Sequence, residues 1–344
     1  AEQLAEQNAG LRATVEAQAR VLSGAESVPG RDQLRHGMPS MVGSSSALAR
    51  ALHVLDRVAD TDLAVLLTGE SGTGKEVAAR ALHQASSRVR GQFMGVNVAA
   101  IQGELLASEL FGHVKGAFTG ADRDRPGLLR KAAGGTLFLD EVTEMDLDLQ
   151  AKLLRALEER KVRPVGSDRE FGIDVRIIAA SNRDPRAAIQ ARRLREDLYF
   201  RLAVVTVNLP PLRERGQDLV ELAKHFVQQF AAEQNIAPPA LSPEFLAALR
   251  ARQWPGNVRQ LRNELQRVWA LAAGGDLQPQ WLSPQDDGPV AGSVPMDLAQ
   301  LEQWAMDRAL EQTGGNKAEA ARLLGIGRRT LYDKLAARQA PDPS

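Results

Sequence analysis

The sequence contains no cysteine among its 344 residues. Disulfide bonds and thiolate metal sites are therefore excluded, and the composition suits the reducing cytoplasm. The chain also lacks an apolar run of about 18 residues, the length that a membrane-spanning helix needs, and it has no secretory signal segment. We therefore expect a cytoplasmic protein without a membrane partner.

The sequence has no excess of either charge, because 43 basic residues balance 43 acidic ones. A surface that binds nucleic acid must therefore be local rather than spread over the whole protein. In other respects the composition is that of a globular protein, with 44% hydrophobic residues, and the length allows two or three domains. The first residue is alanine rather than methionine, which suggests a fragment of a longer protein.

One glycine-rich segment organises the rest of the chain. The apolar run 63–68 predicts a buried strand, the residues Gly69 to Glu76 (GESGTGKE) follow it, and a helical pattern comes next. Backbone N–H groups of such a loop form an anion site with the helix N-terminus, and Lys75 would lie on the outer phosphates of a nucleotide. Glu76 departs from the pattern, which has Ser or Thr there for Mg²⁺. A glycine-rich turn without a ligand is the alternative, and the order of strand, loop, lysine and helix argues against it.

Apolar segments alternate with helical ones from residue 63 to residue 210, which predicts an α/β domain with a parallel, helix-covered sheet. Ser44 to Ser46 predict the N-cap of a helix that runs to about Ala59, and 146–160 predicts an amphipathic helix. The expected strands are 63–68, 93–98, 135–140, 174–180 and 203–209.

Helical patterns alone continue beyond the expected sheet, near 217–234, 243–251 and 257–273, and predict a separate all-helical subdomain. Residues 1–25 carry a heptad-like pattern with Asn8 in the seam, which fits a short coiled-coil signalling helix and, equally well, a solvated linker helix. The expected domains are 1–25 signalling helix, 26–40 linker, 41–214 α/β subdomain, 215–282 helical subdomain, 283–296 linker and 297–344 DNA-binding domain.

Two acids, Asp140 and Glu141, end the third expected strand. Asp140 would hold the Mg²⁺ that bridges nucleotide phosphates, and Glu141 would act as general base on the attacking water. By itself the pair is better explained as a surface acidic turn, but its position after a phosphate loop favours an active site. Asn97 ends the second expected strand and Asn182 follows the fourth, so both lie at the carboxyl edge, where open α/β sheets bind ligands. Taken alone, each is more typical of a turn residue than of a catalytic one.

Arg195 and Arg201 lie six residues apart in RREDLYFRLAV. They could be ordinary surface arginines, or they could be donated across a subunit interface to stabilise charge on the transferring phosphate. The spacing does not choose between these interpretations.

Residues 314–338 predict a helix-turn-helix, with Ala318, Ala321, Leu323 and Leu324 facing inward. Six basic residues against two acidic ones between Asn316 and Arg338 give the local basic surface that a neutral chain needs. A helical hairpin for dimerisation is the alternative, and helix 297–313 is expected to dimerise. The candidates for DNA contact are Arg328, Arg329, Thr330 and Lys334, with Asn316 and Lys317 on the DNA backbone.

The segment 108–121 (SELFGHVKGAFTGA) predicts a loop with an exposed Phe118 beside Thr119, which is unfavourable unless a partner covers the ring. GAFTGA, together with GESGTGKE and GGTLFLDE, closely resembles the sigma-54-dependent transcriptional activators. These are the NtrC-type bacterial enhancer-binding proteins, a clade of AAA+ ATPases. The resemblance covers about 41–340 and includes a Fis-type helix-turn-helix.

The resemblance implies a role for each motif. Gly69 to Glu76 match the Walker A motif, in which the family carries Glu76, and Asp140 and Glu141 match Walker B. Asn97 matches the asparagine that restrains the catalytic glutamate, and Asn182 matches sensor I. The residues expected to bind nucleotide are Val42, Gly43, Gly69, Glu70, Ser71, Gly72, Thr73, Gly74, Lys75, Glu76 and the sensor II residue Arg259.

Arg195 and Arg201 match the arginine fingers that complete the active site of a neighbouring subunit. This sequence departs from the family at Val114, Val98 and Gln260, where polar, Cys and Glu residues are usual. In the second helix of the expected helix-turn-helix, Gly327 and Asp333 are unfavourable for DNA recognition. The residues that match the sigma-54 contact are Gly116, Ala117, Phe118, Thr119, Gly120 and Ala121.

These features together predict an ATP-hydrolysing transcription activator with ATP and Mg²⁺ as ligands. It would bind enhancer DNA as a dimer, assemble into a hexameric ring and convert closed complexes of sigma-54 RNA polymerase holoenzyme into open ones. An upstream receiver domain, phosphorylated by a sensor kinase, or a ligand-sensing domain would regulate it. A DNA-binding regulator that does not remodel polymerase, and an ATPase of the helicase-loader or chaperone kind, are alternatives that the intact GAFTGA segment disfavours.

Overall fold

A computed structural model describes residues 30–272, 275–284, 306, 309, 313, 316–323, 326–328, 330 and 331. The chain divides into two compact units at the junction of Ser283 and Pro284. The expected signalling helix 1–25 and most of the linker 283–296 lie outside the described residues, as do Arg329, Asp333 and Lys334. No helix in the described part of the chain is both long enough and apolar enough to cross a bilayer.

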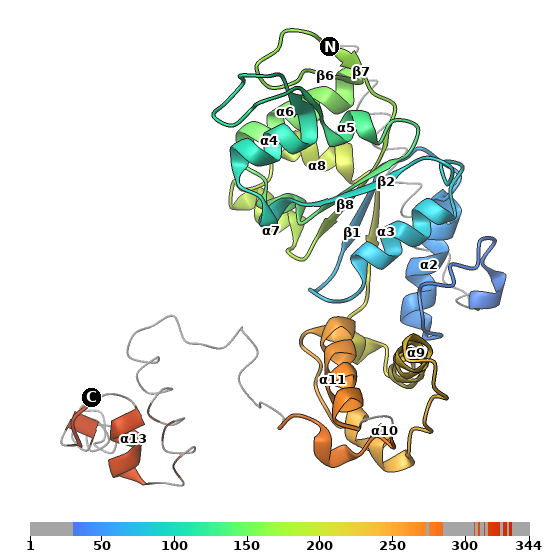
Figure 1. The fold of residues 1–344 in the computed structure, drawn as a ribbon, viewed down its shortest axis with the longest axis vertical. Coiled ribbons are helices and arrows are strands. Elements are labelled where there is room, and N and C mark those ends of the chain that lie inside the picture. Colours follow the sequence, from blue (N-terminus) through green and yellow to red (C-terminus); the bar gives the residue numbers. More distant parts are fainter. Residues whose placement is uncertain are drawn as a thin grey trace, which may run out of the picture. The chain divides into compact units, whose positions relative to one another are not determined.

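The first unit contains a five-stranded parallel sheet in the order β2-β5-β8-β1-β9 (Figure 1). Each strand falls where the sequence predicts one, so the expected parallel sheet is confirmed. Asn97 lies opposite Asp140 in the register of β2 and β5, which brings two predicted site residues together at the carboxyl edge. The strands are β1 (Val65–Thr68), β2 (Phe93–Asn97), β5 (Thr136–Asp140), β8 (Arg176–Ser181) and β9 (Val205–Asn208).

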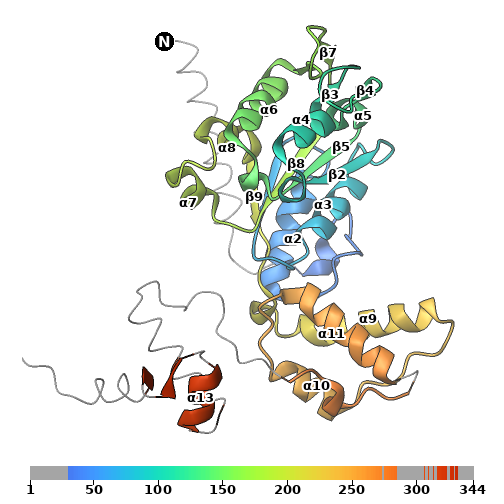
Figure 2. The ribbon, with the colours of Figure 1, turned by 60° about the vertical axis from the view of Figure 1, so that its left-hand side comes forward.

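Helices cover both faces of this sheet (Figures 1 and 2). Alternate residues of a strand point to opposite faces, so Leu137 and Leu139 join one apolar core while Phe138 joins the other. The core of Phe138 includes α2 (Ser46–Val58) and α3 (Lys75–Gln84). The core of Leu137 includes α4 (Gly103–Phe111), α5 (Leu128–Lys131), α6 (Leu147–Glu159), α7 (Pro185–Gln190) and α8 (Glu196–Leu202).

Two short hairpins project from the α/β part, and neither is predicted from the sequence. One pairs β3 (Gly112–His113) with β4 (Arg125–Pro126), and the other pairs β6 (Lys161–Val162) with β7 (Phe171–Gly172). Strands of two residues are too short to give an alternating pattern. The first hairpin encloses the GAFTGA segment.

The helical subdomain, called the lid below, contains α9 (Asp218–Glu233), α10 (Pro243–Arg250) and α11 (Asn257–Ala272). Its apolar core includes stacked Phe226 and Phe230, with Trp269 beside them. The helices expected near 217–234, 243–251 and 257–273 are thus confirmed. Short 3-10 turns connect the elements of this unit: η1 (Arg31–Gln33), η2 (Val98–Ala100), η3 (Val142–Glu144), η4 (Leu212–Glu214) and η5 (Pro279–Trp281).

The second unit contains α13 (Lys317–Leu323), the first helix of the expected helix-turn-helix. Met306, Ala309, Ala320, Ala321 and Leu331 form its small buried core. The inward position of Ala321 is confirmed. Ala320 is an inward residue that the sequence interpretation missed.

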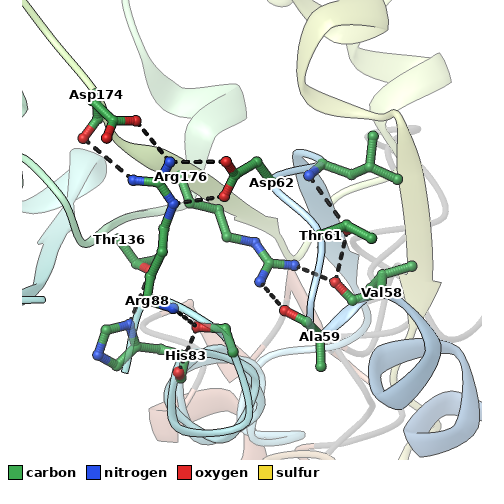
Figure 3. Close-up of polar contacts among 11 residues, drawn as sticks. Val58, Ala59, Thr61, Asp62, His83, Arg88, Thr136, Asp174 and Arg176 are labelled. Carbon is green, nitrogen blue, oxygen red and sulfur yellow. Dashed lines mark hydrogen bonds and ion pairs between the residues drawn. The ribbon is translucent and has the colours of Figure 1, made fainter. Parts of the chain in front are cut away.

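The amino edge of the sheet carries a cluster of charged side chains (Figure 3). Arg88 binds Asp62 at 2.6 and 2.9 Å and Asp174 at 2.7 Å. Arg176, at 1% exposure, donates to the carbonyls of Val58 and Ala59, which close the C-terminus of α2, at 2.8 and 2.7 Å. Burial lowers the pKa of Arg176 to about 10.

Candidate functional site

A cleft of about 550 Å³ lies between the carboxyl edge of the sheet and the lid. The phosphate loop forms one wall, the acids that end β5 form the floor, and α9 and α11 of the lid form the other wall. Arg195 and Arg201 do not line it. The predicted site residues that line this cleft are Val42, Ser71, Gly72, Thr73, Gly74, Lys75, Glu76, Asn97, Asp140, Glu141 and Arg259.

The phosphate loop turns where glycine permits it. Gly74 has a φ of +102° and stands at the N-cap of α3, so the first backbone N–H groups of that helix open toward the loop. Lys75 begins the helix and is buried, and its ammonium group donates to the carbonyls of Gly69 and Glu70 at 2.8 and 3.1 Å. Burial lowers the pKa of Lys75, while the carboxylates of Glu141 and Asp140 oppose that shift. A buried cation beside backbone N–H groups is the arrangement that binds phosphate.

The acids Asp140 and Glu141 sit where β5 leaves the sheet. Burial raises the pKa of both carboxyl groups, and the nearby Lys75 works in the opposite direction. Glu141 has a φ of +55°, a left-handed conformation that is uncommon for a residue with a Cβ and that occurs at functional sites. Two desolvated carboxyl groups facing a lysine can hold a divalent cation and accept a proton from water.

Asn97, expected to restrain the catalytic glutamate, contacts the neighbouring acid in this structure. The side-chain amide of Asn97 donates to Asp140 at 3.4 Å. The hydrogen bond to Glu141 comes instead from the backbone N–H of Asn182, at 2.9 Å. The register of β2 and β5 explains the difference, because it places Asn97 directly opposite Asp140.

The residues at the cleft fit magnesium through Asp140. Mg²⁺ keeps several waters and needs only one or two carboxylates when nucleotide phosphates supply the other oxygens. The carboxylate of Asp140 is partly buried and has a raised pKa, so a cation beside it would offset its desolvation. Glu76 is exposed and pairs with Arg80 at 2.8 Å, so its carboxylate is already engaged.

Glu70, expected among the nucleotide-binding residues, forms a joint between the phosphate loop and the lid. Arg213 binds its two carboxylate oxygens at 2.6 and 2.9 Å, and the fully buried Asn257 donates to it at 3.1 Å. These contacts hold the pKa of Glu70 below its usual range. The backbones also meet here, since a Cβ on Gly72 would lie 2.2 Å from the carbonyl oxygen of Gly256.

Asp218, at the start of α9, forms a second joint at the other end of the cleft. This fully buried carboxylate accepts from the backbone N–H groups of Ser44 and Ser45 at 2.8 and 2.7 Å, and it pairs with Arg215 at 2.8 Å. Arg215 also donates to the carbonyl of Val42 at 2.8 Å. Ser45 is confirmed as the N-cap of α2. The segment around Val42, which is expected to bind nucleotide, is thus held by the lid.

The lid residues of the WPGNVRQL motif also contact the loop. The backbone N–H of Arg259 donates to Gly72, and its guanidinium donates to the hydroxyl of Ser71, both at 3.3 Å. The side chain of Gln260 accepts from the backbone N–H of Gly256 at 2.9 Å, which caps the start of α11. An amide oxygen makes this bond as a carboxylate would, so the departure at Gln260 leaves the helix start intact.

The sequence interpretation did not find Arg213, Arg215, Asp218 or Asn257. Their partners lie as many as 187 residues away along the chain, so no local pattern connects them. The sequence did contain one signal for these contacts. In PPLRERGQD, charged residues lie directly beside an apolar turn.

Arg195 is the N-cap of α8 and Arg201 lies in its last turn, on a different part of the surface. Arg195 pairs with Asp197 at 2.7 Å, and Arg201 donates to the carbonyl of Leu157 at 2.9 Å. Both are exposed. Since neither reaches the cleft of its own chain, a role in hydrolysis would require a neighbouring subunit.

The GAFTGA segment is a compact turn. Gly116 donates to Ala121 at 2.8 Å, and Ala121 donates to Phe118 at 3.0 Å. Thr119 is exposed as expected, but Phe118 is half-buried, which corrects the expectation of an exposed ring. Its ring meets the ring of His113 edge-on, with 5.0 Å between centroids.

Val114 connects this turn to the neighbouring hairpin. Its backbone N–H donates to the carbonyl of Val165 at 3.2 Å, and Val165 donates back to Gly112 at 2.8 Å. The bonds use only the backbone of Val114, so an apolar side chain at this position does not disturb them.

The DNA candidates that can be described all lie on the surface of the second unit. Asn316, Lys317, Arg328 and Thr330 are exposed. The carbonyl of Asn316 accepts from the backbone N–H groups of Glu319 and Ala320, so Asn316 directly precedes the first turn of α13. The carbonyl of Gly327 accepts from Leu331, which marks the start of the next helical turn.

Three family signatures cover most of the chain. Residues 41–208 match the sigma-54 interaction domain, residues 213–290 match the AAA+ ATPase lid domain, and residues 297–337 match the Fis family of bacterial regulatory proteins. Their order is that of the α/β part, the lid and the second unit.

Whole proteins match across the same length. The transcriptional regulatory protein ZraR of Klebsiella oxytoca is 46% identical over 302 residues, which are 86% of this chain and 68% of that protein. FlbD of Caulobacter vibrioides is 42% identical over 328 residues, which are 88% of this chain and 72% of FlbD. The crystal structure of NtrX from Brucella abortus in complex with ATP, at 34% identity, gives a TM-score of 0.66 over 87% of this chain and 69% of that chain. The chain therefore belongs to the sigma-54-dependent transcriptional regulators, which combine an AAA+ ATPase domain with a Fis-type helix-turn-helix.

Proposed function

We propose that this protein hydrolyses ATP to remodel closed complexes of sigma-54 RNA polymerase into open ones, after binding enhancer DNA. The observation that carries the proposal is the pairing of two elements in one α/β domain. The acids Asp140 and Glu141 face Lys75 in the cleft, and the GAFTGA turn (Gly116 to Ala121) projects from the same domain.

Hydrolysis follows from the chemistry of the cleft. Glu141 accepts a proton from water as the water oxygen bonds to the γ-phosphorus, and the bond from that phosphorus to the bridging oxygen breaks to release ADP and phosphate. Asp140 would hold Mg²⁺, which supplies positive charge to the phosphates when bound. Lys75 and the loop N–H groups stabilise the negative charge on the outer phosphates. Arg259 approaches the same phosphates from the lid, and Asn182 orients Glu141 through its backbone.

A ring of subunits would complete this site. Arg195 and Arg201 are exposed and lie away from their own cleft, which fits donation to a neighbour's γ-phosphate. A hexamer, assembled from DNA-bound dimers, is the assembly we propose. Partial support for nucleotide binding comes from NtrX, whose structures contain ATP and ADP.

The remaining partners follow from the other elements. The exposed Asn316, Lys317, Arg328 and Thr330, with Arg329 and Lys334, would contact enhancer DNA in a major groove. The protein would act in the cytoplasm, where polymerase and DNA are found. A sensor kinase of a two-component pathway, or a sensed ligand, would control assembly.

The replacement Thr119→Ala tests the function of the turn. We expect an ATPase rate within about two-fold of wild type, because Thr119 is exposed and away from the cleft. Capture of sigma-54 holoenzyme with ADP and a phosphate transition-state analogue should be lost. Thr206→Ala, at an exposed position on β9, serves as the control and should capture normally. Normal capture by Thr119→Ala would show that the turn does not contact sigma-54.

A further inference from the structure

His113 lies between the GAFTGA turn and helix α4. Its side chain is buried, at 7% exposure, and it shares a hydrogen bond of 2.6 Å with the hydroxyl of Ser108 on α4. The ring of Phe118 rests on the same imidazole at 5.0 Å, with an angle of 70° between the planes. Edge-to-face pairs of this geometry are favourable beyond the burial of their surface. His113 thus has one contact to a helix of the domain and another to the turn.

The rest of the turn is held by backbone hydrogen bonds. Two of them close the turn on itself, and another joins Val114 at its base to the carbonyl of Val165. The backbone N–H of Lys115 also donates to the side-chain carboxylate of Asp124. These bonds set the path of the backbone but do not determine where the ring of Phe118 points. The ring of Phe118 contacts His113, and the imidazole of His113 is hydrogen-bonded to Ser108.

The stretch 97–113 connects this contact to the nucleotide cleft. Asn97 at the end of β2 donates to Asp140, and η2 follows immediately. Helix α4 begins a few residues later and carries Ser108 near its C-terminal end. Asn97, which contacts Asp140, and Ser108, which contacts His113, are thus linked along the chain by one 3-10 turn and one helix.

We propose that His113 is a positioning residue that keeps Phe118 half-buried, and that Phe118 must leave this imidazole before it can contact a partner. The inference rests on the proposed function of the turn. Release would expose Phe118 beside the already exposed Thr119, so the two residues could bind together. Ser108 acts through His113, because loss of its hydroxyl lets the imidazole rotate.

Amide hydrogen exchange of residues 112–121 in the full chain, measured without polymerase, tests the proposal. His113→Ala should raise exchange in this segment by about 2- to 10-fold, the range that corresponds to the loss of an aromatic pair. Ser108→Ala should give a smaller increase. His113→Phe keeps an aromatic ring in place and should bring exchange back toward the wild-type rate.

The chain offers a matched control in His83. This buried histidine also pairs with an aromatic ring, that of Phe93 at 5.5 Å, and bonds a hydroxyl, that of Thr136 at 2.9 Å. His83→Ala should leave exchange of 112–121 unchanged. Unchanged exchange in His113→Ala, or an equal rise in His83→Ala, would overturn the proposal. If His113→Ala does not fold, Phe118→Leu removes the same ring contact and should raise exchange in the same segment; an unchanged rate would again contradict the proposal.

A second measurement uses purified sigma-54. His113→Ala should bind it without any nucleotide analogue, whereas wild type should require the analogue. If wild type never binds sigma-54, the proposed function fails while the exchange result still stands. If wild type binds it and His113→Ala has the same requirement for the analogue, the inference about His113 alone fails.

Discussion

The charged groups at the carboxyl edge of the central sheet and the Arg88–Asp62 pair at its amino edge have pKa shifts in opposite directions. At the carboxyl edge, burial raises the pKa of Asp140 and Glu141 and lowers that of Lys75, so each group is shifted toward its neutral form. At the amino edge, Arg88 and Asp62 stabilise each other's charge, and the pKa of Asp62 is lowered.

The difference indicates what each edge is for. Opposite charges that are paired, as in Figure 3, compensate each other and contribute to stability. Such groups are already engaged and are not available to bind a charged ligand. Charged groups that are desolvated and poorly compensated lower the stability of the fold. They are typical of sites where a bound ligand supplies the opposite charge. The left-handed backbone of Glu141 adds strain at the same edge.

The largest expected effect separates activity from stability at the carboxyl edge. Glu141→Gln removes the proposed general base and should lower the ATPase rate by about 10²- to 10⁴-fold. The thermal midpoint should not fall, because the variant removes a carboxylate whose burial is unfavourable. Steady-state hydrolysis and a thermal melt measure the two quantities. Glu144→Gln, one turn away, should hydrolyse ATP normally. A comparable loss of activity in that variant would contradict the assignment of Glu141 as the general base.

The next effect concerns stability at the amino edge. Arg176→Met leaves the carbonyls of Val58 and Ala59 without their donors and should lower the free energy of unfolding by about 2–4 kcal/mol. Denaturant unfolding measures the loss. Arg88→Gln breaks pairs with exposed carboxylates and should cost only about 1 kcal/mol. Equal losses in the two variants would mean that burial does not distinguish these arginines.

The smallest expected effect is a difference between the acid limit of the ATPase rate and the acid limit of folding stability. Glu141 must be ionised to accept a proton, and its pKa is raised, so the ATPase rate should fall with decreasing pH already above the ordinary glutamate value of 4.5. Asp62 has a lowered pKa in the folded protein, so its contribution to stability is present above the ordinary value of 3.8 and is lost as pH falls through the lower folded value.

A pH range should therefore exist in which the protein stays folded but is inactive. Profiles of the ATPase rate and of the thermal midpoint, measured on the same samples, would reveal this range. Asp62→Asn should flatten the acid limb of the stability profile and leave the limb of the rate in place. Coincident limbs in wild type would contradict the separation of the two edges.

The sequence predicted the sheet and the lid helices because each has a strong local pattern: apolar runs such as VLLT and TLFLD, and long amphipathic repeats. It predicted the cleft residues because phosphate and metal chemistry restricts the residue types at Lys75 and Asp140. It missed the joints at Glu70 and Asp218, since their partners lie 143 to 187 residues away. The sequence also did not predict the ring contact between Phe118 and His113. Two aromatic residues five positions apart in a loop form no characteristic pattern.

The joints at Glu70 and Asp218 also bear on where this protein can be cut. The matched domain families meet between residues 208 and 213, so the family boundaries suggest this point for a truncation. It would remove Arg213 and Asn257 from Glu70, and it would take Asp218 away from the N–H groups of Ser44 and Ser45. Both ends of the nucleotide cleft would then lose the contacts that shape them. The α/β part and the lid match separate sequence families, but in the structure they belong to a single compact unit.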